Sequence, residues 1–345
     1  MPTKNTPPLA LTCGDPASIG SELTLKAWRA RYQKGIAPFI YIGDANHLQN
    51  TAEILQLNVP IRRINKPEQA VEIFDEYLPV LHQELAEQPV FGAPTSNNAK
   101  SVIKSIETAV EWVQTGKCRA LTTNAIAKNI LYQVGFKYPG HTEFLEHLAN
   151  RTSGETHKSV MMLVSNLLRV VPVTIHIPLM EVGAKLTADL IYDTAKIVVR
   201  DLQLYYGIMK PKLAIAGLNP HAGEDGAMGT EDKDIVALAV ERLEADGYDV
   251  AGPMPADTMF HKTARTQYDV ALGMYHDQVL IPIKTLDFDN GVNVTLGLPF
   301  IRTSPDHGTA FDIAGQGIAS PNSLIAALKI AHKMANNKMS ARSYG

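Results

Sequence analysis

The sequence has few cysteines and no excess of positive charge, and both absences limit what the protein can be. Only Cys13 and Cys118 occur in 345 residues, too few for a disulfide framework and typical of a protein in the reducing cytoplasm. The formal net charge of −3 lacks the basic excess that nucleic-acid binders normally carry. We therefore expect a cytoplasmic protein with no nucleic-acid partner.

The chain also lacks a long uninterrupted hydrophobic run. Residues 1–8 are polar, without the apolar segment of a secretory signal. The most hydrophobic stretch, residues 160–180, is interrupted by Asn166, Arg169 and His176, which argues against a membrane span. Two buried strands near residues 161–164 and 168–175, joined by a turn, explain this stretch better. No membrane partner is expected.

Three nucleotide or catalytic motifs are missing. No Gly-x-Gly-x-x-Gly follows an apolar run, so the ordinary dinucleotide-binding fingerprint is absent. The P-loop pattern Gly-x-x-x-x-Gly-Lys-Ser/Thr and the Gly-x-Ser-x-Gly nucleophile elbow are absent as well. These absences argue against a P-loop nucleotide triphosphatase and a serine hydrolase of the elbow type.

Short apolar runs alternate with segments of helical periodicity. The runs that predict buried strands are residues 8–12, 39–42, 120–122, 213–217 and 270–274. The stripes that predict core-facing helices are Val102, Ile103, Ile106, Val110 and Val113 before Gly116, then Ile235, Leu238, Ala239 and Leu243 before Gly247, then Leu324, Leu328 and Ile330. This alternation predicts an α/β sandwich with a largely parallel sheet.

Histidines follow three of the predicted strands. His176, His221 and His276 each come shortly after an apolar run, and ligands of open α/β sheets bind at the carboxyl edge of the strands. Three neutral imidazoles with open positions suit a catalytic divalent cation such as zinc, and cobalt or magnesium remain alternatives. Because the three lie far apart in the sequence, ordinary polar loop residues remain the competing interpretation.

A second group indicates an anion site. Tyr138-Pro-Gly-His-Thr-Glu143 precedes a helical segment, where free N–H groups and the side chains of His141 and Thr142 suit a phosphate. The plainer interpretation, slightly favoured by these residues alone, makes Thr142 the N-cap.

Several polar residues further along the chain are also candidates. Lys284, Asn293 and Arg302 fall in surroundings that look like loops, and could bind phosphate or carboxylate or be simply solvated. Asp257 and Asp277 are candidates for orienting a ligand or moving a proton, with turn formation as the plainer alternative.

Seven motifs together resemble the 4-hydroxythreonine-4-phosphate dehydrogenase family. In chain order they are Gly14-Asp-Pro-Ala-Ser-Ile-Gly-Ser-Glu22, Tyr138-Pro-Gly-His-Thr-Glu143, Thr174-Ile-His-Ile-Pro-Leu179, Gly217-Leu-Asn-Pro-His-Ala-Gly-Glu224, Gly252-Pro-Met-Pro-Ala-Asp-Thr258, Tyr275-His-Asp-Gln278 and Asp306-His-Gly-Thr-Ala-Phe-Asp-Ile-Ala-Gly315. The resemblance covers nearly the whole chain. Two segments depart from the usual pattern: Ser18 and Ser21 replace a glycine and a proline, and residues 123–128 read Thr-Asn-Ala-Ile-Ala-Lys instead of Thr-Ala-Pro-Ile-Asn-Lys.

The resemblance implies an isocitrate/isopropylmalate-dehydrogenase-like α/β/α sandwich with two subdomains and an interdomain cleft. We expect residues 1–135 with 305–345 to form the first subdomain, and residues 136–304, with the metal ligands and dimer contacts, the second. It also implies a homodimer with the active site at the subunit interface, NAD or NADP as cofactor, and one divalent metal (zinc, magnesium or cobalt) per site.

The resemblance also implies roles for particular residues. His176, His221 and His276 match the metal ligands. The positions that match substrate contacts are His141, Thr142, Lys284, Asn293 and Arg302. Cofactor contacts are expected at His307, Gly308 and Asp312. For the mechanism, our own hypothesis is that Asp257, Asp277 or Lys284 handles protons.

The implied reaction is oxidation of 4-phosphohydroxy-L-threonine at C3, followed by decarboxylation, in vitamin B6 synthesis. A paralogous dehydrogenase of 4-phosphoerythronate or 4-phosphothreonate is the alternative. A metal-dependent hydrolase or acyl-phosphate transferase, and a non-catalytic phosphate binder, are interpretations from other classes.

Overall fold

The computed structural model describes residues 6–343, and the chain divides into two compact units. Unit 1 comprises Met1–Ser159 and Leu298–Asn336, and unit 2 comprises Val160–Gly297 and Asn337–Gly345. The first boundary therefore lies later than the expected position near residue 135. The reason is packing: Phe144 and Leu145 of α7 (His141–Ser153) share one hydrophobic core with Ile106 of α5 (Ala99–Gln114), so α7 belongs to unit 1.

The strands of unit 1 are all parallel. They are β1 (Leu9–Thr12), β2 (Phe39–Gly43), β3 (Ile61–Ile64), β4 (Leu78–His82), β5 (Leu121–Thr122) and β12 (Arg302–Pro305), in the order β3-β4-β2-β1-β5-β12. β1 and β2 are buried along their whole length, as expected of strands covered on both faces. Three runs predicted as strands are thus confirmed in this unit.

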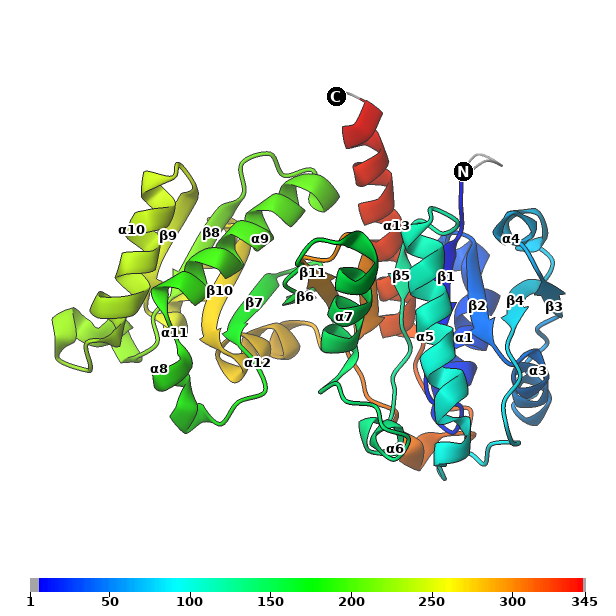
Figure 1. Ribbon diagram of the computed structural model, residues 1–345. Coiled ribbons are helices and arrows are strands. Elements are labelled where there is room, and N and C mark those ends of the chain that lie inside the picture. Colours follow the sequence, from blue (N-terminus) through cyan, green and yellow to red (C-terminus); the bar gives the residue numbers. More distant parts are fainter. Residues whose placement is uncertain (1–5, 344–345) are drawn as a thin grey trace. The chain divides into compact units, whose positions relative to one another are not determined.

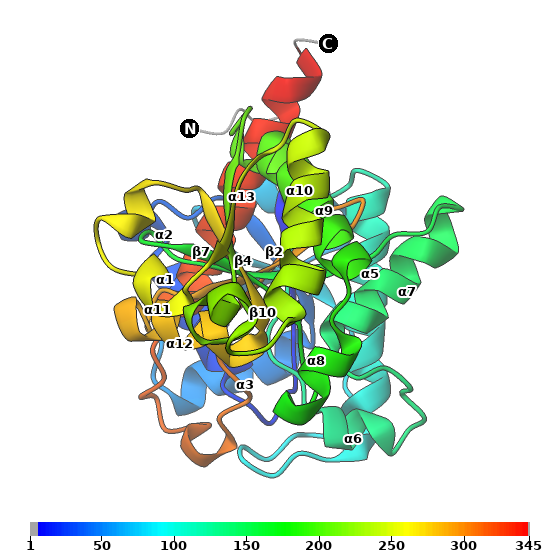
Figure 2. The ribbon, with the colours of Figure 1, turned by 90° about the vertical axis from the view of Figure 1, so that its left-hand side faces the viewer.

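Helices cover both faces of this part of the sheet. Besides α5 and α7 they are α1 (Gly20–Arg29), α2 (Arg31–Lys34), α3 (Ala45–Ile54), α4 (Pro67–Ile73), α6 (Lys128–Tyr132) and α13 (Asn322–Ser343). In Figure 2, α5 and α7 lie on one side of the strands and α1 and α13 on the other. In the stripe predicted before Gly116, Val102, Ile106 and Val110 are buried on α5, which ends at Gln114. Ile103 and Val113 are only half-buried and pack against the same core. In the last predicted stripe, Leu324 and Leu328 are buried, whereas Ile330 is only half-buried.

The strands of unit 2 form a mixed sheet. They are β6 (Val160–Val164), β7 (Arg169–Thr174), β8 (Lys212–Ala216), β9 (Asp249–Met254), β10 (Val270–Tyr275) and β11 (Val292–Leu296), in the order β11-β6-β7-β10-β8-β9 (Figure 1). β6 runs antiparallel to β7 and β11, and the other pairs are parallel. The predicted pair of buried strands across residues 160–175 is confirmed as an antiparallel hairpin.

The helices of unit 2 also flank both faces of the sheet. They are α8 (Val182–Lys185), α9 (Ala188–Tyr206), α10 (Leu238–Ala245), α11 (Ala256–Met259) and α12 (His276–Leu286). α9 and α10 lie on one side, and α11 and α12 on the other (Figure 2). The prediction that Leu238 faces the core is wrong, because this side chain is 45% exposed. A π-helical turn at Asp232–Ala237 interrupts the helical period just before α10 begins. In residues 6–343, no helix has both the length and the apolar character needed to cross a membrane.

Candidate active site

The carboxyl ends of β7, β10 and β8 carry the three histidines predicted from the sequence. These strands are adjacent and parallel, so they end at one edge of the sheet of unit 2. His276 directly follows β10, and His176 comes two residues after the end of β7. His221 lies five residues beyond the end of β8. The strand-then-histidine arrangement inferred from the sequence is therefore a feature of the fold.

Two of these imidazoles lie side by side. The ring centroids of His176 and His276 are 5.9 Å apart, a separation that two metal–nitrogen bonds of about 2 Å can bridge from the ring edges. Both residues line a cavity of about 440 Å³, a size suited to a small ligand. Its lining is Thr174, His176, Ile177, Leu179, Val182, Tyr275, His276 and Asp277. The Nδ1 atom of His276 is 2.6 Å from Asp277 Oδ1, which orients the ring and leaves Nε2 for a ligand.

His221 does not line this cavity and lies in an unusual turn. Residues 221–225 all have a left-handed backbone, with φ of 53° at His221, 53° at Ala222 and 42° at Glu224. His176 also has a positive φ, of 50°. Non-glycine residues rarely adopt this conformation, and when they do they cluster at functional sites. Two of the three candidate ligands therefore carry backbone strain.

Two residues that sequence reasoning missed hold this edge together. Gln278 accepts a hydrogen bond from the Met274 N–H at 2.7 Å and donates to the Gly217 carbonyl at 2.7 Å, which joins β10 to β8. Asp232 accepts from the N–H groups of Leu218 (2.6 Å) and Asn219 (3.0 Å), which anchors the turn before His221. Gln278 sits inside the Tyr-His-Asp-Gln motif and could have been suspected; nothing local in the sequence marks Asp232.

The donor chemistry of this edge fits a divalent cation. Imidazole nitrogens are suitable ligands for such a cation. The Asp277 carboxylate, hydrogen-bonded to His276, is the kind of partner that usually orients a histidine ligand. Within one copy of the described chain, no three His, Cys, Asp or Glu side chains lie close enough together to hold a metal ion. The pair His176 and His276 is thus the assembled part of the predicted metal site.

The remaining candidates in unit 2 lie on regular elements. Asp257 is exposed in the first turn of α11, a helix that contacts the His221 turn. Lys284 lies on α12, with its Nζ 5.9 Å from the Phe288 ring centroid, and Asn293 lies on β11 opposite Leu163. The expectation that Lys284, Asn293 and Arg302 occupy loops is wrong. Helix α12 includes Lys284, and the strands β11 and β12 include Asn293 and Arg302, despite the Gly- and Asn-rich sequence around them. The Oδ1 atom of Asn293 is buried without a partner among the described residues.

A separate basic cluster surrounds the start of α7 in unit 1. The N-cap is Gly140 in an extended conformation, and no side chain caps the helix, so the interpretation of Thr142 as the N-cap is wrong. Thr142 lies one residue inside the helix, near the positive end of the helix dipole. Burial, followed by the charges of Arg302 and Lys128, holds the pKa of His141 well below its usual range. His141 is therefore a neutral hydrogen-bonding group at pH 7.

Arg302 brings a buried positive charge to this cluster. It is 3% exposed at the first position of β12, and its Nη2 donates to Thr123 Oγ1 at 2.7 Å. Burial lowers the pKa of its guanidinium to about 10, although the charge of the nearby Glu143 carboxylate acts to raise this pKa. The guanidinium therefore stays charged at neutral pH. His141 and Arg302, far apart in the sequence, are thus close enough to influence one another.

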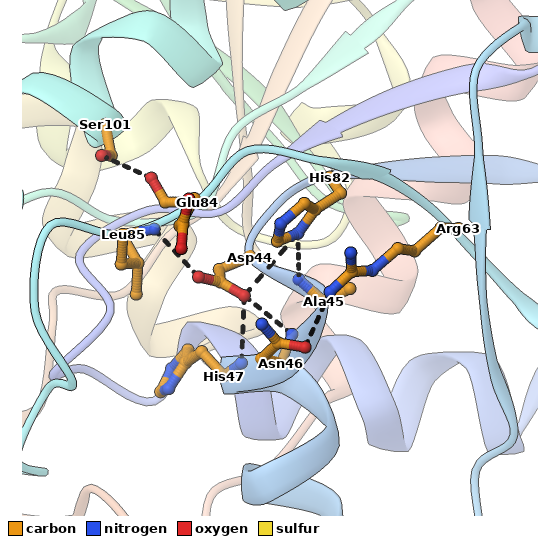
Figure 3. A network of polar contacts seen from close by, with 9 residues as sticks. All are labelled: Asp44, Ala45, Asn46, His47, Arg63, His82, Glu84, Leu85 and Ser101. Carbon is orange, nitrogen blue, oxygen red and sulfur yellow. Dashed lines mark hydrogen bonds and ion pairs between the residues drawn. The ribbon is translucent and has the colours of Figure 1, made fainter.

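Another polar network lies at the carboxyl end of β2 (Figure 3). Asp44 caps α3 by accepting from the N–H groups of Asn46 (2.7 Å) and His47 (3.3 Å), and it also accepts from Leu85 at 2.9 Å. His82 Nδ1 accepts from the Ala45 N–H at 3.1 Å and lies 3.7 Å from Asp44 Oδ1. The network holds the loops at this edge and is structural.

The comparisons with known proteins decide between the classes of function. The model of the family described as "Pyridoxal phosphate biosynthetic protein PdxA" matches residues 35–331. The chain belongs to the PdxA family. A curated relative from Methylorubrum populi, named 4-hydroxythreonine-4-phosphate dehydrogenase, is 55% identical over 95% of this chain and 94% of its own.

Solved structures agree with membership of the PdxA family. The crystal structure of 4-hydroxythreonine-4-phosphate dehydrogenase from Klebsiella pneumoniae has a TM-score of 0.85 at 35% identity, covering 95% of this chain and 99% of its own. A terephthalate 1,2-cis-dihydrodiol dehydrogenase from Burkholderia xenovorans has a TM-score of 0.64 at 26% identity, covering 95% and 98%. The resemblance seen in the sequence and the mixed α/β fold are thereby confirmed. As a PdxA chain, the protein is an oxidoreductase.

The departures from the usual PdxA motifs are accommodated by hydrogen bonds. Ser18 Oγ donates to the Asp15 carbonyl at 2.6 Å and accepts from the Gly20 N–H at 3.2 Å. Asn124 Nδ2 donates to the Thr12 carbonyl at 3.0 Å. A methyl group at Gly14 would lie 2.7 Å from Asn124 Cβ, so the glycine and the asparagine pack directly on one another. These polar substitutions therefore hold the loop between β1 and α1 in place.

The loop predicted to contact the cofactor follows β12 in unit 1. His307 Nδ1 lies 2.9 Å from the Gly308 carbonyl, and its Nε2 is buried without a partner among the described residues. Burial lowers the pKa of His307 below its usual value. Gly308 and Asp312 are exposed, and the Ile19 N–H donates to the Thr309 carbonyl at 3.2 Å, which ties the loop to the start of α1.

Proposed function

We propose that this chain oxidises 4-phosphohydroxy-L-threonine at C3, with NAD or NADP as the hydride acceptor, in the vitamin B6 pathway. The product would be 2-amino-3-oxo-4-phosphohydroxybutanoate, which decarboxylates to 3-amino-2-oxopropyl phosphate. The observation that carries this proposal is the 55% identity to a named 4-hydroxythreonine-4-phosphate dehydrogenase over 95% of the chain. The free, buried Cys13 and Cys118 are compatible with the cytoplasm as its location.

We assign the cation to His176, His221 and His276, with zinc, magnesium or cobalt as candidates. When bound, such a cation supplies Lewis-acid stabilisation of the alkoxide and of the enolate left by decarboxylation. Asp277 holds the His276 ring in position for this role. The left-handed backbone at His176 and His221 supports the assignment, because such strain persists where function needs it.

The residues of the chain then have separate tasks. The hydroxyl proton passes to one of Asp257, Asp277 or Lys284 while hydride leaves C3 for the nicotinamide ring. Loss of carbon dioxide leaves its electron pair on C2, and a proton from one of the same groups completes the product. Lys284 and Asn293 would also contact the substrate.

The phosphate is held by His141, Thr142 and Arg302 in this proposal. Remote binding of the phosphate positions C3, so these residues contribute to rate as well as to affinity. The start of α7, with no side-chain cap, and the buried charge of Arg302 support this role. We place the nicotinamide cofactor against His307, Gly308 and Asp312, where the buried His307 Nε2, which has no partner in the described part of the chain, offers a polar contact.

We further propose a homodimer in which the active site lies at the subunit interface. Leu179 and Met180, which closely follow His176 in the chain, are 67% and 93% exposed. Large apolar side chains exposed together beside a functional residue are typical of an interaction surface. A partner subunit would also explain why one copy of the chain gathers only part of the ligand set.

An NADH-forming assay on three substrates tests the function. We expect turnover of 4-phosphohydroxy-L-threonine with kcat/KM at least about tenfold above that for 4-phosphothreonate and 4-phosphoerythronate. Equal or better turnover of either alternative would assign the chain to a paralogous dehydrogenase. Absence of NAD or NADP reduction with all three would contradict a dehydrogenase of this substrate class.

A further inference from the structure

Lys128, at the start of α6, lies against the first turn of α7. A methyl group added at the N-cap Gly140 would be 3.4 Å from both Cε and Nζ of Lys128, and 3.4 Å from Glu143 Oε2. The ammonium group therefore lies beside the first turn of a 13-residue helix whose N–H groups no side chain caps. No carboxylate pairs with Lys128 within residues 6–343, because each ion pair formed there involves other groups.

A second observation at the same place points to a missing ligand. The Nε2 atom of His141 is fully buried and has no hydrogen-bond partner among the described residues. A buried polar atom without a partner is energetically unfavourable, so such atoms are usually satisfied by a ligand or water. The charges of Arg302 and Lys128 both act on this ring, which places Lys128 in the same small region as His141 and Arg302, two of the three residues proposed to hold the phosphate.

The charge balance of this region favours a dianion. Lys128 and Arg302 contribute two positive charges, Glu143 contributes one negative charge, and the neutral His141 contributes none. The start of α7 adds roughly half a positive charge. The excess of about 1.5 positive charges matches a phosphate monoester near neutral pH, which carries about 1.5 to 2 negative charges.

From these observations we propose that Lys128 is a further substrate-binding residue. Its ammonium donates to the substrate phosphate at the start of α7, opposite Arg302, and selects phosphorylated over non-phosphorylated hydroxy acids. The inference rests on the proposed function for the identity of the substrate, but not for the presence of a phosphate site. Ordinary solvation is the competing explanation, because Lys128 is exposed in this structure.

Replacement of Lys128 by Ala tests the inference, with Lys137→Ala as the matched control. Lys137 is an exposed lysine in the same segment between α6 and α7, and its charge is not among those acting on His141. The inhibition constant for inorganic phosphate and the KM for the phosphorylated substrate are measured for both variants. One charge-assisted hydrogen bond corresponds to about 1.5 kcal/mol or more, so Lys128→Ala should weaken both by at least about tenfold.

Four further results separate a binding role from a structural one. Lys137→Ala should stay within about twofold of the wild type, and Lys128→Arg should recover most of the affinity because it keeps a charged donor. The KM for 4-hydroxythreonine, which lacks the phosphate, should be unchanged in Lys128→Ala. The unfolding temperature of Lys128→Ala should match that of the wild type, since the side chain is exposed.

Failure of this inference is distinguishable from failure of the proposed function. If the wild type oxidises the phosphorylated substrate and Lys128→Ala binds phosphate as tightly as the wild type, the inference is overturned and the function stands. If the wild type reduces no cofactor but phosphate affinity, measured by calorimetry, still falls about tenfold in Lys128→Ala, the phosphate site stands and the function fails.

Discussion

At the scale of single residues, buried histidines make the stability of unit 1 depend on pH. His47 is 4% exposed, and its Nε2 has no partner among the described residues. Burial lowers the pKa of His47 from 6.5 to about 4, against the opposing charge of Asp44 and a backbone hydrogen bond with Pro16. His141 and His307 are shifted in the same direction by burial.

The sign of this dependence follows from proton uptake. Between about pH 6.5 and pH 4 the unfolded chain binds a proton at His47 that the folded chain does not, so the free energy of unfolding falls as the pH falls. Each unit of pKa difference corresponds to about 1.36 kcal/mol, so His47 alone contributes up to about 3 kcal/mol across this range. Above pH 6.5 its contribution is constant.

The variant His47→Gln should therefore lose less stability on acidification than the wild type. Urea unfolding followed by tryptophan fluorescence reports on unit 1, because Trp28 and Trp112, the two tryptophans of the chain, both lie there. We expect the wild-type unfolding free energy to drop more steeply between pH 6.5 and pH 4, by up to about 3 kcal/mol. An offset that is the same at every pH would show that His47 does not titrate as its burial requires.

At the scale of elements, the position of α12 on β10 depends on one glycine. A methyl group at Gly273 of β10 would lie 2.3 Å from Val279 Cγ1 and 2.9 Å from Gln278 Oε1, both on α12. Since α12 begins at His276, a shift of this helix moves the candidate ligand and its partner Asp277. The close approach of strand and helix therefore sets the geometry of the site.

Gly273→Ala should accordingly destabilise unit 2 by about 1–3 kcal/mol through overpacking. Hydrogen exchange should increase in the peptides that cover α12, and metal affinity should fall. Gly183→Ala in α8 is the control, because a methyl group there meets no atom within 4 Å. Unchanged exchange in α12 of Gly273→Ala would contradict the tight packing described here.

The strands and helices that the sequence predicts at this scale are those with a clear apolar pattern. Apolar runs such as Phe39–Gly43 and Val270–Tyr275 are buried on both faces of a parallel sheet, so their hydrophobicity is nearly continuous and easy to read. The errors occur where local rules compete with tertiary structure. A π-turn rotates Leu238 to the surface, and Gly140 takes the capping position in place of Thr142.

In unit 2, position alone predicted the candidate site where a side chain closely follows an apolar run. His276 and His176 are found in this way, since adjacent parallel strands bring their carboxyl ends together. The role of Asp232 and the role proposed for Lys128 could not be found, because they depend on contacts with the turn before His221 and with the start of α7. No spacing rule in the sequence encodes such contacts.

At the scale of the whole molecule, the central claim is that three histidines hold the cation on which oxidation depends. The sequence alone could not decide this claim, because the histidines are separated by long stretches of chain and only two of them are assembled in one copy. Family membership supplies the dehydrogenase chemistry, and the edge formed by β7, β10 and β8 supplies a place for it.

The most direct measurement is the metal content and turnover of His221→Ala. His261→Ala is the control, because His261 is another exposed histidine of unit 2 without an assigned role. We predict that His221→Ala retains less than about a tenth of the wild-type metal and loses at least about a hundredfold in the rate of NADH formation, while the control keeps both. Wild-type metal content and turnover in His221→Ala, or full wild-type activity after complete removal of metal by a chelator, would contradict the account.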